Sequence, residues 1–245
     1  MSSAVRHLRR QWGAVALVGC VGLVVIGVTQ PRWLAGSAAV WTYCLWLLLR
    51  GLDDNRREGE SRVLASFGWP TLVSVARGGL LAMVAGFVFL PTPLGALAFA
   101  PAVAYSVASL LDHVDGRLAR ALGRTTRLGE KLDIELDALG ILIASALAVQ
   151  YEKVPPWYIA IGLARYGFVL AIAWRRRCGA SVVELDPLSL RRVLAGVQMG
   201  FLSVALWPPI PSELTLFVAP VFGGATLAMF ARDWWRVSGR LVRNA

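Results

Sequence analysis

Apolar stretches alternate with shorter polar segments along the whole chain. Eight such stretches are each close to the roughly 20 residues that a helix needs to cross a bilayer. Lipid offers no hydrogen-bond partners, so a crossing segment must satisfy its own backbone as a helix. We therefore predict an all-α, polytopic membrane helix bundle with about eight transmembrane helices. The predicted spans are 13–29, 33–49, 71–90, 95–111, 132–150, 157–174, 193–209 and 214–231.

Basic residues are distributed unevenly over the segments that join these spans. Of the 25 Lys and Arg residues, 21 fall on one side of the predicted membrane. Only Arg32 and Lys153 fall on the other side, and Arg77 and Arg165 lie within spans. Cytoplasmic loops of membrane proteins carry the excess of Lys and Arg. The pattern predicts a multi-pass protein of the cell (inner, cytoplasmic) membrane with both termini in the cytoplasm.

Composition supports a membrane protein and argues against a nucleic-acid-binding one. The chain is 57% hydrophobic, with a mean hydropathy of +0.60, above the apolar share usual in soluble domains. The net charge of +10 is spread over alternate loops and forms no continuous basic stripe. Anionic lipid headgroups and pyrophosphate substrates are therefore the expected partners, and no nucleic acid is expected.

Two segments near the predicted membrane surface carry further expectations. Arg6, Arg9 and Arg10 precede the first span without a clear cleavage site, which favours a retained signal anchor. Loop 50–69 becomes mildly apolar at 63–67, which is compatible with a short interfacial helix there. The three cysteines, Cys20, Cys44 and Cys178, show no metal or disulfide spacing.

Four carboxylates lie between the fourth and fifth spans. Asp112 and Asp115 are three residues apart, and Asp133 and Asp137 are four apart, so each pair lies on one face of a helix. The helix after Asp137 has only about 12 wholly apolar residues, or about 18 Å. That is too short for hydrocarbon about 30 Å thick, so we expect Asp133 and Asp137 to lie below the membrane surface, in a cavity open to the cytosol. Charge there is costly unless it is compensated, and a divalent cation is the simplest partner.

The segment 112–137 resembles the signature of the CDP-alcohol phosphotransferase (CDP-alcohol phosphatidyltransferase) family, D-x2-D-G-x2-A-R-x8-G-x3-D-x3-D. The motif covers 26 of the 245 residues, so it indicates the chemistry better than the substrate. All eight fixed positions match: Asp112, Asp115, Gly116, Ala119, Arg120, Gly129, Asp133 and Asp137.

The resemblance implies a metal centre. Asp112, Asp115, Asp133 and Asp137 would be the ligands of Mg²⁺ or Mn²⁺, with two ions in the site. Oxygen-only ligation and a pyrophosphate substrate suit either metal. Asp137 would also be the catalytic base that takes the proton from the acceptor hydroxyl, after which CMP leaves.

The resemblance also implies residues that bind the substrates. Gly116, Ala119, Arg120, Thr126 and Gly129 would contact the CDP-linked donor.

Candidates for contacts with the acceptor or its phosphate are less specific. Arg77 and Arg165 lie in spans, where each could instead snorkel or pair with an acid. Arg175 begins a run of three arginines that the positive-inside rule explains by itself. His113 occupies a variable motif position, and we expect it not to be a ligand. Glu130 and Glu135 are expected to be solvated or paired with Lys131 and Arg127.

The family usually has a six-helix core, which is expected here at residues 70–232. Residues 1–69 would then form an N-terminal extension of two helices and a cytoplasmic interfacial segment, with a tail at 233–245. The segment 70–77 weakly resembles the family's usual entry into its first core helix. This resemblance gives the expected start of the core. Family members are commonly homodimers, and we expect one here.

The expected activity is transfer of a phosphatidyl group from CDP-diacylglycerol to a small alcohol, such as glycerol 3-phosphate or an inositol phosphate, in phospholipid biosynthesis. A soluble CDP-alcohol donating to a lipid alcohol is an alternative within the family. A cation transporter would use the acids as an ion path, but it predicts acids dispersed at mid-membrane depth. A non-catalytic scaffold would not need intact carboxylates.

Overall fold

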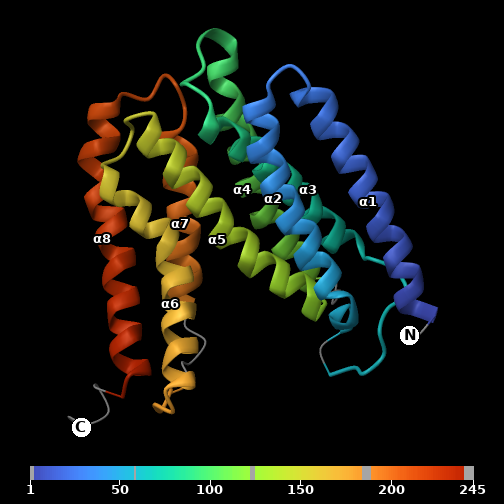
Figure 1. Cartoon of the computed structure of the whole chain (residues 1–245). Helices are drawn as coiled ribbons and strands as arrows, with labels where there is room; N and C mark the ends of the chain where they lie inside the picture. The colour runs from blue at the N-terminus through green and yellow to red at the C-terminus, as the bar shows by residue number, and fades with distance from the viewer. Residues whose placement is uncertain (1–2, 58, 122–124, 184–188, 240–245) are drawn as a thin grey trace. The chain divides into compact units, whose positions relative to one another are not determined.

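The computed structural model describes residues 3–57, 59–121, 125–183 and 189–239; for 114–121 and 189–190 it describes the backbone alone. Every regular element in these ranges is helical, which confirms the predicted all-α class (Figure 1). The α-helices are α1 (Ser3–Gly27), α2 (Pro31–Arg50), α3 (Trp69–Gly86), α4 (Phe99–Ala121), α5 (Arg127–Gln150), α6 (Ile159–Arg177), α7 (Ser189–Ala205) and α8 (Ser212–Val237). Short 3-10 helices are η1 (Leu52–Asp54), η2 (Phe87–Phe89), η3 (Gly95–Ala98) and η4 (Pro156–Tyr158).

Each of the eight predicted spans falls on one of these α-helices, but not all of them are equally suited to cross a bilayer. Within the described residues, five segments are long and apolar enough: Ser3–Gly27, Trp69–Phe89, Gly95–His113, Pro156–Arg177 and Ser212–Val237. Helices α2, α5 and α7 fall short of that standard. The protein is therefore a multi-pass membrane helix bundle, with five candidate spans among the described residues where the sequence predicted about eight.

One local prediction is confirmed and another needs correction. The helix that contains the predicted span 95–111 continues to Ala121, so α4 includes both Asp112 and Asp115, as their predicted shared helix face requires. The interfacial helix predicted at 63–67 is absent, because the described part of loop 55–68 contains no helix. Instead the buried side chain of Asn55 donates from Nδ2 to the carbonyls of Leu64 (3.2 Å) and Ser66 (3.0 Å). These bonds fix the loop in a non-helical path.

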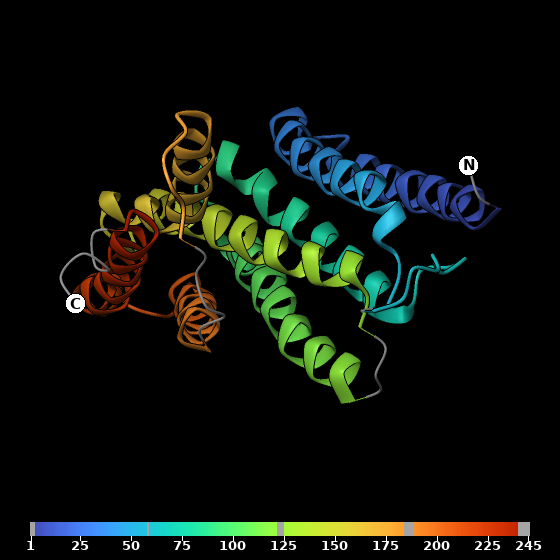
Figure 2. The same ribbon diagram turned by 90° about the horizontal axis from the view of Figure 1, so that it is seen from below.

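The chain divides into two compact units, residues 1–143 and 144–245, with the division inside α5. In the first unit α2 packs against both α1 and α3, and α3 packs against α4. Figures 1 and 2 both show α1 and α2 side by side as a helical hairpin. This unit contains α4 and the first part of α5, which carry the predicted metal ligands, and α3 beside them.

In the second unit α6 and α7 each pack against α8. A buried glutamine on α7 links these elements. Gln198 donates from Nε2 to the Phe222 carbonyl and to Thr226 Oγ1, both at 2.7 Å, and its Oε1 accepts from the Tyr158 hydroxyl at 2.6 Å. Such polar contacts between helices replace the hydrophobic driving force that lipid does not supply.

Candidate active site

The start of α5 is fixed by a side-chain cap. Thr126 Oγ1 accepts from the Gly129 backbone N–H at 3.1 Å, and the Thr126 carbonyl accepts from Glu130 N–H at 3.0 Å. A threonine at this position satisfies N–H groups that the first helical turn leaves without partners. The helix therefore begins at Arg127, and Asp133 and Asp137 follow on one of its faces.

Gly129 lies in the first turn of α5, against this cap. A Cβ at position 129 would come 3.3 Å from Thr126 Oγ1, tighter than an ordinary van der Waals contact. A glycine lets the cap close without displacing the threonine. The structure thus gives two of the predicted donor-binding residues, Thr126 and Gly129, a local structural role. Their contact with the donor stays a prediction.

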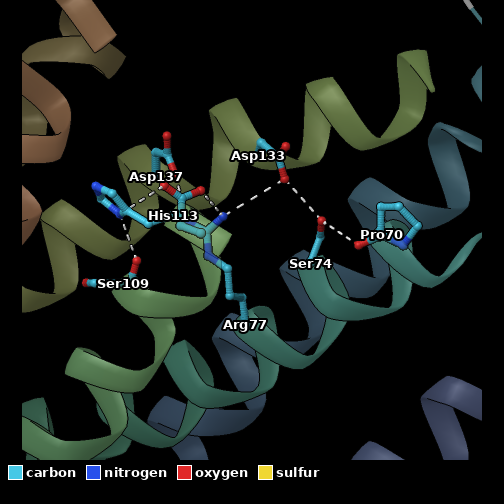
Figure 3. A network of polar contacts seen from close by, with 8 residues as sticks. Pro70, Ser74, Arg77, Ser109, His113, Asp133 and Asp137 are labelled. Carbon is cyan, nitrogen blue, oxygen red and sulfur yellow. Dashed lines mark hydrogen bonds and ion pairs between the residues drawn. The ribbon is translucent and has the colours of Figure 1, made fainter. Parts of the chain in front are cut away.

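Arg77 on α3 is the centre of the site. Its side chain is only 2% exposed. Nη1 donates to Asp112 Oδ1 at 2.6 Å, and Nη2 donates to Asp137 Oδ1 at 2.6 Å. Asp133 Oδ1 lies 3.9 Å from Nη1. A buried guanidinium needs acids to compensate its charge, and three carboxylates of the motif supply them (Figure 3).

The tertiary structure therefore brings together acids from two helices. Asp112 comes from α4, and Asp133 and Asp137 come from α5. Their side chains are 19%, 37% and 28% exposed, so all three also face solvent-accessible space. Arg77 was predicted as a possible acceptor contact; in this structure both of its terminal nitrogens are engaged by the motif.

Ser74, one turn before Arg77, also faces the motif. Its Oγ lies 3.0 Å from Asp133 Oδ1 and 3.2 Å from the Pro70 carbonyl (Figure 3). A single hydroxyl proton can serve either acceptor. Sequence reasoning missed this residue. Its position three residues before a charged residue in an apolar helix was the signal, because i and i+3 share a helix face.

His113 makes a local contact. Its Nδ1 lies 3.1 Å from the Ser109 carbonyl, one turn back on α4, and 3.9 Å from Asp112 Oδ2. The ring is 53% exposed. Its exclusion from the ligand set stays a prediction.

The predicted metal ligands suit a hard divalent cation, because their coordinating atoms are carboxylate oxygens alone. Arg77 contacts three of these carboxylates through their Oδ1 atoms. Among the described side chains, no group of three or more His, Cys, Asp or Glu residues stands close enough to bind a metal. The side chains of four predicted residues lie outside the described set: Asp115, Gly116, Ala119 and Arg120.

The other two basic candidates lie on α6, in the second unit. Arg165 is partly buried. Arg175 donates from Nη2 to the Ser181 carbonyl at 3.0 Å, and its guanidinium lies 5.8 Å from the ring centroid of Trp234. Their contacts with an acceptor stay predictions.

Comparison with known proteins matches residues 67–231 to the family model described as CDP-alcohol phosphatidyltransferase. The CDP-diacylglycerol–glycerol-3-phosphate 3-phosphatidyltransferase of Bacillus subtilis is 26% identical over 161 residues, which cover 62% of this chain and 82% of the relative. The enzyme of that name from Shigella flexneri is 30% identical over 171 residues, covering 67% and 91%. The one from Escherichia coli K12 is 30% identical over 149 residues, covering 58% and 79%. No solved structure matches.

Proposed function

Because this chain belongs to the CDP-alcohol phosphatidyltransferase family, we propose that it moves a phosphatidyl group from CDP-diacylglycerol to glycerol 3-phosphate and releases CMP. The names of the similar enzymes support this donor and acceptor. The observation that carries the proposal is the convergence of Asp112, Asp133 and Asp137 around Arg77.

Asp112, Asp133 and Asp137, together with Asp115, would hold one or two Mg²⁺ or Mn²⁺ ions. A bound cation would neutralise the pyrophosphate of the donor and stabilise the departing CMP. Arg77 orients this set from the side of α3 through Asp112 and Asp137. Ser74 adds a hydrogen-bond partner for Asp133.

Asp137 acts as the general base. Its carboxylate accepts the proton of the acceptor hydroxyl while the hydroxyl oxygen forms a bond to the β-phosphorus of the donor. The bond from that phosphorus to the oxygen bridging to the α-phosphorus breaks, and its electron pair leaves with CMP. Arg77 donates to Oδ1 of Asp137, so it fixes the carboxylate in position.

The remaining substrate contacts follow the family pattern. Arg120 would pair with donor phosphate through its planar fork, and Gly116 and Ala119 would let the nucleotide approach the backbone. Thr126 accepts a hydrogen bond through Oγ1, so its own hydroxyl proton stays available to a donor phosphate. Arg165 and Arg175 are the candidates for the acceptor phosphate. The site would face the cytoplasm, as the distribution of basic residues indicates, and the enzyme would be a homodimer.

The test is CMP release by purified protein supplied with CDP-diacylglycerol, Mg²⁺ or Mn²⁺, and a panel of alcohols that includes glycerol 3-phosphate, inositol phosphate and serine. We expect release with glycerol 3-phosphate and its loss on chelation of the metal. Asp137→Asn should lower kcat by about 10²–10⁴-fold, the usual contribution of proton transfer.

Glu130→Gln, which removes an exposed acid from the same helix, is the matched control and should retain activity. Release with a different alcohol would change the acceptor and keep the class. No release with any alcohol, from folded protein, would contradict the proposal, and a CDP-alcohol donor with diacylglycerol would then be tested.

A further inference from the structure

The first turns of α5 are held by residues that precede the family match. The match begins at residue 67, and four contacts reach α5 from the segment 43–57, which comprises the end of α2, η1 and the residues after it. These contacts reach the helix that carries Asp133 and Asp137. They lie away from the helix face that carries these two carboxylates.

Two of the four contacts join polar side chains. Tyr43 on α2 donates its hydroxyl to Glu135 Oε2 at 3.3 Å. Lys131 Nζ donates to Asp54 Oδ2 at 2.7 Å. Lys131 and Glu135 are four residues apart, so they share one helix face.

The other two contacts hold the end of the helix. The Arg127 backbone N–H donates to the Arg56 carbonyl at 3.1 Å, which gives a partner to the first N–H of α5. Leu128 is 1% exposed and packs so closely on Gly51 that a Cβ there would collide with Leu128 Cδ1. Leu52 beside it is also buried.

The geometry of a helix relates this face to the carboxylates. Glu135 lies two residues from both Asp133 and Asp137, which is about 200° around a helix of 3.6 residues per turn. Arg77 and Ser74 of α3 therefore contact one side of α5, and Tyr43 and Asp54 contact the nearly opposite side. Contacts on opposite faces prevent the helix from turning about its axis.

Rotation matters because carboxyl oxygens stand far from the helix axis. At about 5–6 Å from the axis, a turn of 10° moves an oxygen about 1 Å. A catalytic group must be held within about 0.5 Å of its productive position. The proposed reaction therefore requires α5 to be held against rotations of only a few degrees. The contacts from the segment 43–57 supply such a restraint.

We propose that Tyr43 and Asp54 are positioning residues, which set the rotation of α5 and so align Asp133 and Asp137 for metal binding. The inference rests on the proposed function, in that it takes these two aspartates as metal ligands. It assigns to the N-terminal extension a part in the chemistry of the core.

The experiment uses the full-length protein with the double substitution Tyr43→Phe and Asp54→Asn. Asp53→Asn is the matched control, because Asp53 is the adjacent exposed acid. Mn²⁺ affinity is measured by electron paramagnetic resonance. Hydrogen exchange of amides 127–137 and CMP release are measured on the same variants. A third variant, Asp54→Lys with Lys131→Asp, restores the ion pair with reversed charge.

We expect the double variant to bind Mn²⁺ about three- to tenfold more weakly, below the 10–100-fold loss typical of partners that contact a metal ligand directly. Exchange at 127–137 should quicken, kcat should fall with little change in KM, and the reversed pair should recover affinity. Mn²⁺ affinity equal to that of Asp53→Asn would overturn the inference. Wild-type protein that binds no Mn²⁺ and releases no CMP would instead overturn the proposed function.

Discussion

At the scale of single residues, Arg77 is a buried charge that depends on its acidic partners. It carries a positive charge with a side chain that is only 2% exposed, and its two terminal nitrogens contact Asp112 and Asp137. In these ion pairs each charge compensates the other. An uncompensated charge in a buried site costs several kcal/mol of stability. The motif carboxylates therefore contribute to stability as well as to the proposed chemistry.

Replacing Arg77 by Met should destabilise the protein by about 3–5 kcal/mol, since it leaves three partly buried acids close together without their cation. Arg77→Lys should lose less stability, yet a single ammonium cannot reproduce a fork that reaches two carboxylates. Denaturant unfolding in detergent measures both. Arg32→Met, at an exposed arginine, is the control; equal stability of the two methionine variants would contradict the role of the ion pairs.

A second prediction concerns the side chain of Thr126, which caps the start of α5. Thr126→Ala should cost about 1 kcal/mol and speed exchange at the first amides of α5, because the Gly129 N–H loses its acceptor. Thr126→Ser keeps the hydroxyl and should behave like wild type. Hydrogen exchange of amides 127–131 is the measurement, and indistinguishable alanine and serine variants would show that the cap is not needed.

At the scale of elements, the loop between α2 and α3 depends on one buried side chain. Asn55 is fully buried and bonds the carbonyls of Leu64 and Ser66. The backbone of Leu64 also donates to the Asn55 carbonyl at 2.7 Å. Loops satisfy their backbone through such side chains when no helix does so. This explains why an apolar stretch at 63–67 forms no helix.

Asn55→Ala should loosen this loop, because two carbonyls lose a buried donor at a cost of about 1–3 kcal/mol. The loop contains Arg56, Arg57 and Arg62, so limited trypsin digestion in detergent reports its opening. Cleavage should become several-fold faster, in keeping with a local loss of that size. Ser66→Ala leaves the carbonyl in place and should digest like wild type; the same rate in both variants would refute the role of Asn55.

At the scale of the whole molecule, the question is which side of the membrane the site faces. The uneven distribution of Lys and Arg predicts that loop 175–192 is cytoplasmic. Cys178, just after α6, is exposed, whereas Cys44 is buried. Cys20 is exposed on α1 within the apolar span Ser3–Gly27, where lipid would surround it.

The native cysteines therefore report orientation. A membrane-impermeant maleimide should label the protein in inverted membrane vesicles and not in intact cells, because only Cys178 has water access for its thiolate. Cys178→Ser should abolish the label. Labelling of intact cells would place this loop on the outside and contradict the predicted orientation.

The sequence by itself determined the class of the protein, the eight α-helices found in the described residues and the motif of 112–137. These are local properties: apolar length predicts helices in a membrane, and spacing of three or four residues places acids on one face. It also identified Thr126 and Gly129 as candidate donor-binding residues, whereas their cap on α5 became visible only in the structure.

Only the tertiary structure decided which side chains meet. Arg77 pairs with Asp112 and Asp137 across 35 and 60 residues, and Tyr43 with Glu135 across 92. Such pairings depend on how the helices pack and turn relative to one another, which periodicity does not encode. For the same reason the non-helical loop at Asn55, the role of Ser74 and the contacts of the N-terminal extension with α5 could not be predicted from spacing.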